Sequence, residues 1–264
     1  MLLEIQLKRS QAATKTKLSS SRICIAVKPV ISLSKLYRLE ITAEDPIFFS
    51  TREANKRINT GRYLHNYALT YSIIHASGQA DKLSEYSQKI EKEDGKGPKY
   101  FEDLSGLDFY VFPANPIDVS FTSEKVNTQS EGYREKIDGD RGKRYFTGHT
   151  IKRISTGSTF ETFLIAELDV EIPDYARLGK FMSKIKIEKE ELDFSEKDVK
   201  EEKTTAVLNA LDTPEEFESN AKNLKVEKMR PTPIILSAVH SGKAFVTEDE
   251  VIPADVGYLQ KKES

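Results

Sequence analysis

The chain has 264 residues, of which 38% are apolar and 31% are charged, so a thin core must serve one domain with long insertions or two small domains. No apolar run approaches the roughly 18 residues that cross a bilayer, and no apolar segment follows a basic start, which predicts a soluble, cytoplasmic protein without a membrane contact. The single cysteine, Cys24, excludes an internal disulfide and a cysteine-based metal cage.

The net charge of −2 hides a segregation of charge along the chain. Residues 1–38 carry eight basic side chains against one acid, and the windows 141–158 and 175–186 hold several basic residues and no acid. Residues 189–222 have instead eleven acids and five lysines. A charge run can be a solvated face, but this segregation favours a surface that binds a polyanion, offset by an acidic surface.

The first predicted element is a half-buried strand over 36–42, where apolar and polar residues alternate. The acid-poor segment 1–35 before it fits a transit peptide, a nucleic-acid-binding arm or a start codon set too far upstream, and we expect it to be inert or flexible. An arginine-rich irregular stretch over 51–61 follows, and then a predicted helix over 62–76. Tyrosines at i, i+4 spacing form a row along that helix, a pattern typical of core packing.

Short strands and one projecting hairpin are predicted in the middle of the chain. Polar residues over 78–105 precede strands predicted at 107–112 and 117–122. Residues 123–158 contain the turn sequences D-G-D and R-G, and we expect them to form a projecting β-hairpin.

The last third of the chain is predicted to be mostly β, with one acidic insertion. Further strands are expected at 159–168, around Ile185 and Ile187, at 233–239 and at 244–247. The acidic segment 189–222 is expected to be a peripheral insertion with helical turns at 204–211 and 214–221. This order of elements predicts an α+β fold of the ferredoxin-like kind, β-α-β-β-α-β, with insertions, over residues 36–264.

Signatures of metal and nucleotide chemistry are absent from the sequence. There is no H-E-x-x-H, no C-x-x-C pair, no phosphate-binding G-x-x-x-x-G-K-[ST] and no G-x-S-x-G elbow. The four histidines do not combine with another strong ligand at metal-binding spacing. We therefore expect no metal and no cofactor.

One constellation could support metal-free cleavage of RNA. His149 lies within a few residues of Lys143, Tyr145 and Lys152, and these side chains can act as acid, base and phosphate ligand. A basic hairpin that only holds phosphate would contain the same residues, so this activity is kept as the alternative.

Non-catalytic binding of single-stranded RNA explains the two basic windows better. The run R-L-G-K-F-M-S-K at 177–184 offers a glycine for close backbone approach, a hydroxyl and three cations. In the other window Tyr145 and Phe146 lie between Arg144 and Lys152, where bases could stack on them.

Four runs resemble one known family closely. They are L-Y-R-L-E-I-T at 36–42, F-F-S-T-R-E at 48–53, Y-L-H-N-Y-A-L-T-Y at 63–71 and R-L-G-K-F-M-S-K at 177–184. From residue 36 to the C-terminus their order and spacing are similar to those of the Cas-five subunit, or Csc-one, of type I-D CRISPR Cascade effector complexes, a member of the RAMP superfamily.

This resemblance implies a ferredoxin-like, RRM-like RAMP domain with a β-hairpin thumb at 123–158. It implies a subunit that caps the foot of the complex, grips the 5′ handle of the crRNA, and contributes to target double-stranded DNA binding near the protospacer-adjacent motif. The implied protein partners are the Cas-seven-type (Csc-two) backbone subunit and the Cas-ten-like large subunit. Precursor cleavage is expected to belong to a separate nuclease. If this chain instead cleaved the precursor itself, it would be a metal-independent crRNA-processing endoribonuclease, which is the alternative function.

We expect RNA to contact residues of both basic windows and of the stretch before and at the start of the first helix. These candidates are Arg52, Arg57, Arg62, His65, Arg141, Lys143, Arg144, Tyr145, Phe146, His149, Lys152, Arg177, Gly179, Lys180, Ser183 and Lys184.

Overall fold

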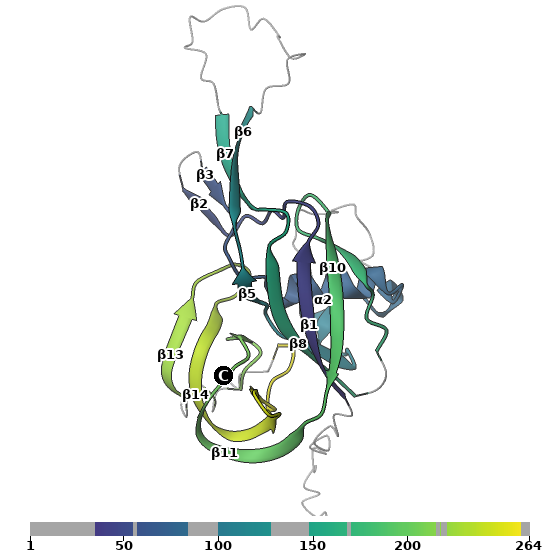
Figure 1. Ribbon diagram of the computed structural model, residues 1–264, viewed down its shortest axis with the longest axis vertical. Helices are drawn as coiled ribbons and strands as arrows, with labels where there is room; N and C mark the ends of the chain where they lie inside the picture. The colour runs from purple at the N-terminus through teal and green to yellow at the C-terminus, as the bar shows by residue number, and fades with distance from the viewer. Residues whose placement is uncertain are drawn as a thin grey trace, which may run out of the picture. The chain divides into compact units, whose positions relative to one another are not determined.

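The computed structural model describes residues 35–54, 57–83, 100–127, 148–167, 170–214, 217 and 221–259. The expectations for the segment 1–34 and for the hairpin residues 128–147 lie outside these ranges. In the described part of the chain, strands form three sheets, and helices are few (Figure 1). None of the described helices is long and apolar enough to cross a membrane.

The first sheet has six antiparallel strands in the order β4-β8-β1-β10-β9, with β5 also paired to β8. Its strands confirm the predictions at 36–42, at 159–168 and around Ile185. The bounds are β1 Lys35–Ala43, β4 Phe109–Val111, β5 Asn115–Asp118, β8 Thr159–Ala166, β9 Tyr175–Leu178 and β10 Ser183–Leu192.

Helix α2 (Asn66–Ala76) covers one face of this sheet (Figure 1). Alternate residues of β1, among them Leu39 and Ile41, form one core with Leu69 and Ile73 of the helix. The helix starts four residues later than predicted, because Leu64 pairs with Ala114 in a β-bridge and the next residue caps the helix. The remaining described helical segments are η1 (Ala80–Lys82) and α4 (Tyr100–Leu104).

The second sheet is organised around the 13-residue strand β14 (Ile234–Val246). Strands β11 (Ser195–Lys203) and β12 (Leu208–Asn209) pair along one edge of β14, and β13 (Lys222–Glu227) and β15 (Val251–Pro253) pair along the other. Figure 1 shows β11 and β14 curving together. The two strands predicted at 233–239 and 244–247 are therefore one continuous strand.

The expected helical turns at 204–211 are wrong, because this segment forms β12 and irregular backbone. Ala206, Leu208 and Phe217 are buried in a second core that also contains Leu36 and Phe163 of the first sheet. The acidic segment 189–222 is therefore not wholly peripheral. One i, i+4 backbone bond, from the amide of Ala221 to the carbonyl of Phe217 (2.8 Å), agrees with a helical turn near 214–221.

The third sheet has four strands in the order β2-β3-β7-β6. Strands β6 (Phe121–Asn127) and β7 (Gly148–Ile154) pair antiparallel, while β3 (Arg57–Asn59), which follows β2 (Arg52–Ala54), pairs parallel to β7. The strand predicted at 117–122 is split, because the chain leaves the first sheet after β5 and enters this one at β6.

Candidate nucleic-acid interface

A groove runs past the start of α2 and along β3, and two adjoining hollows form it. Their volumes are about 620 Å³ and 330 Å³, and both are lined by Thr51, Tyr63 and Met229. We call the pair the tyrosine groove. The other lining residues are Phe49, Ser50, His65, Tyr67, Ala68, Tyr71, Tyr100, Lys180, Arg230 and Pro231 in the larger hollow, and Asn59, Thr60, Gly61, Arg62, Phe121, Lys152, Glu227 and Lys228 in the smaller.

Aromatic rings form one wall of this groove. The ring of Tyr100 lies 4.9 Å from that of Tyr67 and 6.1 Å from that of Tyr71, centroid to centroid. The hydroxyl of Tyr71 donates to Asp103 at 2.5 Å, which fixes the ring. The i, i+4 tyrosines expected to be core residues thus also line a hollow in which a flat apolar group could stack.

Basic side chains outnumber acidic ones around the groove. Lys180 and Arg230 line the larger hollow, and Arg62, Lys152 and Lys228 line the smaller, against one acid, Glu227. The ammonium of Lys152 lies 3.7 Å from the centroid of the Phe121 ring, a cation–π contact. The fold thus brings both basic windows, represented by Lys152 and Lys180, to one groove. The sequence prediction missed Lys228 and Arg230, which form a short basic run of their own.

The predicted RNA-binding residues of the third sheet are in strands whose backbone lies beside the groove. Arg52 and Arg57 are in β2 and β3, and the parallel pairing places Arg57 opposite Thr150 of the first basic window. His149 is in β7, opposite Val126. The side chains of Arg52, Arg57 and His149 lie outside the described part. So do the whole residues Arg141, Lys143, Arg144, Tyr145 and Phe146, and with them most of the proposed acid–base constellation.

His65 caps helix α2, and its contact with RNA stays a prediction. Its Nδ1 accepts a hydrogen bond from the amide of Tyr67 (3.2 Å), and its Nε2 lies 2.9 Å from the hydroxyl of Thr232. An acceptor Nδ1 places the proton of the neutral ring on Nε2, which then donates to Thr232. Burial lowers the pKa of the His65 imidazole to about 4, so the ring is neutral at pH 7 and both nitrogens are engaged within the protein.

The carboxylate of Asp212 is the centre of a buried polar network that includes Asn66, the residue directly after the cap. It accepts hydrogen bonds from Tyr67 Oη (2.7 Å), Asn66 Nδ2 (2.7 Å), Tyr110 Oη (3.0 Å) and the Leu259 amide (2.9 Å). Burial raises the pKa of the Asp212 carboxyl, and these four donors oppose that rise. The Asp212 carboxylate, buried and bonded to four donors, is therefore a joint: it links α2, β4 and the C-terminal segment, which supply those donors.

This network explains the run Y-L-H-N-Y-A-L-T-Y. Asn66 also accepts from Asn209 (3.1 Å), and the hydroxyl of Thr70 lies 2.6 Å from that of Tyr258. The polar residues of the run tie α2 to the segment after β12 and to the C-terminal segment. One signal could have identified Asp212 in advance: it is an acid that directly follows the mostly apolar run 206–211.

Gly179 and Ser183 make contacts within the protein, and their contact with RNA stays a prediction. Gly179 has φ +80°, and a Cβ there would lie 2.8 Å from the carbonyl oxygen of Phe48. The close approach that the glycine permits is therefore to the protein backbone. The hydroxyl of Ser183 is buried and donates to the carbonyl of Pro46 (2.7 Å).

Arg177 and Lys184 lie opposite each other on the outer face of the β9–β10 hairpin. The ammonium of Lys184 is 4.1 Å from the centroid of the Tyr175 ring. The guanidinium of Arg177 is 3.8 Å from the carboxylate of Asp45 and donates to the carbonyl of Met182 (3.3 Å). Arg177 and Lys184 are close to the groove residue Lys180 in the chain, but their side chains are on the face of the hairpin that points away from α2.

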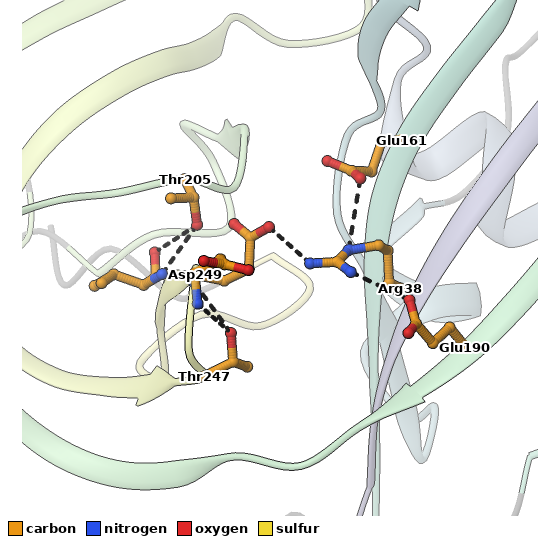
Figure 2. A network of polar contacts seen from close by, with 8 residues as sticks. Arg38, Glu161, Glu190, Thr205, Thr247 and Asp249 are labelled. Carbon is orange, nitrogen blue, oxygen red and sulfur yellow. Dashed lines mark hydrogen bonds and ion pairs between the residues drawn. The ribbon is translucent and has the colours of Figure 1, made fainter.

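On the face of the first sheet opposite α2, Leu36 and Phe163 belong to the second core, whereas the part around Glu40 is acidic. Glu40 pairs in register with Glu188 on one side and with Glu161 on the other, which places these carboxylates on one face. Beside them Arg38 contacts Glu250 (2.9 Å), Glu190 (3.1 Å) and Glu161 (3.5 Å), as Figure 2 shows in part. RRM domains stack bases on aromatic side chains of this face, and its glutamates here are unsuited to that mode.

Metal ligands are not gathered anywhere in the described residues: no group of three or more His, Cys, Asp or Glu side chains there could hold an ion.

The described part of the chain is a mostly β fold with few helices, and it carries a groove lined by aromatic rings and cations. The profile of the family described as type I-D CRISPR-associated protein Cas5/Csc1 matches residues 34–261. The chain belongs to this type I-D Cas5/Csc1 family, which confirms the resemblance noted in its motifs.

Comparison with curated proteins found no match. Among solved structures, the chain is similar to one in the cryo-EM structure of the type III-B Cmr-beta bound to cognate target RNA and AMPPnP. The identity is 9% and the TM-score 0.37, over 80% of this chain and 86% of that one.

Proposed function

We propose that this chain is a non-catalytic subunit of a type I-D CRISPR effector complex and that it grips the 5′ handle of the crRNA in the tyrosine groove. One observation carries the proposal: five cations and one acid line a groove whose wall is made of tyrosine rings. Cations hold phosphates and rings hold unpaired bases, which is the combination that single-stranded RNA requires.

Family membership supports the wider setting of this proposal. In it, the subunit caps the foot of a Cascade complex and contacts the Csc-two backbone subunit and the Cas-ten-like large subunit. Near the protospacer-adjacent motif it contributes to binding of target DNA. The first sheet with α2 would be the ferredoxin-like RAMP domain, and β6 with β7 would be the base of its thumb.

Crosslinking of RNA within the assembled complex tests the site of binding. The full chain would be co-expressed with the other type I-D subunits and a crRNA, irradiated, and digested for mass spectrometry. Crosslinked peptides are expected to contain Tyr63, Tyr100 or Met229. Crosslinks confined to the acidic strand around Glu188 and Glu190 would contradict the proposal, since phosphates and carboxylates repel each other there.

A cleavage assay separates the non-catalytic function from the alternative endoribonuclease. Repeat RNA would be incubated with the purified chain in EDTA, with His149→Ala as the comparison. We expect intact RNA with both proteins. Site-specific cleavage by the wild type that is lost in His149→Ala would establish the alternative.

A further inference from the structure

The turn between β9 and β10, residues 179–182, exposes two consecutive apolar side chains. Phe181 is 55% exposed and Met182 is 61% exposed, and Tyr175 on the same hairpin is 49% exposed. Large apolar side chains gathered on one exposed hairpin mark a binding surface, because single scattered ones are the usual case on a soluble protein. We call residues 179–182 the hairpin tip.

The hairpin tip is held in a fixed conformation. The ring of Phe181 stacks on that of the buried Phe48 at 5.0 Å, with 20° between the planes. The amide of Lys180 donates to the carbonyl of Phe48 (2.9 Å), and the amide of Met182 donates to the carbonyl of Gly179 (3.1 Å). Met182 has a φ of +52°, a conformation that a residue with a side chain adopts only when its surroundings impose it. A rigid exposed ring loses little entropy when a partner covers it.

Charge identifies the kind of partner. Arg177, Lys180 and Lys184 lie within five residues of Phe181 and Met182 in the chain, and the guanidinium of Arg177 donates to the carbonyl of Met182. Among the described residues, the acid in contact with these cations is Asp45, 3.8 Å from Arg177. Exposed apolar side chains with cations close by suit a nucleic acid, whose bases are flat and whose phosphates are anionic.

The position of the hairpin tip in the chain indicates which nucleic acid it would contact, namely an RNA strand bound in the tyrosine groove. The side chain of Lys180 lines the larger hollow, and Phe181, the next residue in the chain, is exposed. We propose that Phe181, supported by Phe48 and flanked by Met182, is a stacking platform for an unpaired base of the single-stranded RNA that leaves the tyrosine groove past Lys180. This inference rests on the proposed function, since it requires RNA in that groove.

The test measures affinity and stacking separately. The full chain and its variants would be titrated into a fluorescent single-stranded oligouridine and, in parallel, into the same RNA with one 2-aminopurine. The variants are Phe181→Tyr, which keeps a ring, and Phe181→Leu, which keeps an apolar side chain without one. Ile117→Ala, at another exposed apolar residue, is the control, and thermal unfolding establishes that each variant is folded.

Phe181→Leu is expected to weaken binding on the order of 5- to 100-fold, the factor that corresponds to loss of one base–aromatic stack. It should also abolish 2-aminopurine quenching, while Phe181→Tyr and Ile117→Ala should behave like the wild type. Equal affinity and quenching for Phe181→Leu and the wild type would overturn the platform. If Phe181→Leu instead impairs only assembly with the other subunits, the tip is a protein contact and the inference is wrong. A wild type that fails to bind the RNA at low salt would overturn the proposed function first, and this inference with it.

Discussion

The hydroxyl of Tyr67 donates a hydrogen bond of 2.7 Å to the carboxylate of Asp212, 145 residues away in sequence. This bond joins the first turn of α2 to the segment after β12, and three more donors complete the carboxylate's shell. The groove wall carried by α2 is thus positioned from the C-terminal part of the chain.

Replacing Asp212 by Asn should destabilise the fold, although the two side chains are nearly equal in size. Asn offers one acceptor oxygen instead of two and adds an amide donor, so at least one buried donor loses its partner. Each such loss costs about 1–3 kcal/mol, which lowers the melting temperature by about 2–4 °C per kcal/mol. Calorimetry would measure this, with the exposed Asp255→Asn as control. An unchanged melting temperature for Asp212→Asn would show that the network is not a joint.

Acid should destabilise the protein through His65. Its pKa is about 4 in the folded state against an ordinary 6.5, so the unfolded chain binds more protons between these values. Stability therefore falls as the pH is lowered from about 6.5 through about 4, by up to about 3 kcal/mol from this group. Urea unfolding of the wild type and of His65→Asn across this range measures the contribution. Asn can cap the helix and does not protonate, so its acid dependence should be shallower.

The matching control is His75→Asn, on the exposed end of the same helix. It should retain the pH dependence of the wild type. Parallel curves for the wild type and His65→Asn would contradict the assignment.

Gly179→Ala should lower the free energy of unfolding more than Gly157→Ala, because the two glycines have different neighbours. Gly179 and Gly157 have nearly the same φ, +80° and +81°, so an alanine bears the same backbone penalty of roughly 1–2 kcal/mol at either position. Gly157 has open space where a Cβ would lie, whereas Gly179 has the Phe48 carbonyl at 2.8 Å. The free energy of unfolding should fall by about 1–3 kcal/mol more in Gly179→Ala, as for other overpacked sites. Equal losses would mean that the Phe48 contact yields without cost.

Cations of the tyrosine groove should determine the salt dependence of RNA binding. If Lys152, Lys180 and Lys228 each neutralise one phosphate, each Lys→Ala change should reduce the slope of log affinity against log salt by roughly 0.7 for single-stranded RNA. The loss should be similar for different RNA sequences, because phosphate contacts carry no base information. Fluorescence titrations at several salt concentrations measure the slope. Lys197→Ala, on the exposed strand β11, should leave it unchanged, and a full slope in a triple variant would place the binding surface elsewhere.

The sequence predicts strands well where one face is buried and poorly where both are. The alternation over 36–42 and the pair Ile185 and Ile187 could be recognised because a half-buried strand has a period of two. The run Ala206, Val207 and Leu208 is buried throughout and has no period, so nothing in it separates a helical turn from β12. Its pairing with β14 is a contact between distant residues, which local pattern does not encode.

The chemistry of the candidate site could be predicted in kind but not in arrangement. The two basic windows meet at one groove because β3 pairs in parallel with β7 and because the amide of Lys180 bonds to Phe48, and both contacts are long-range. The glycine at 179 predicts a close backbone approach, but a glycine does not reveal what approaches it. The sequence places His65 among the expected RNA contacts at the start of the first helix, and only its two hydrogen bonds identify it as a cap.

The structural role of the polar residues of α2 has a consequence for the proposed recognition of RNA. Asn66, Tyr67 and Thr70 use their polar groups in contacts within the protein, so these residues of the run hold the scaffold together. The specificity of the groove would instead be set by side chains outside that joint, such as Arg230, Lys228 and Arg62. Related chains that read different handles could therefore share the whole run, and handle preference would have to be inferred from the loop after β13 and the approach to the helix.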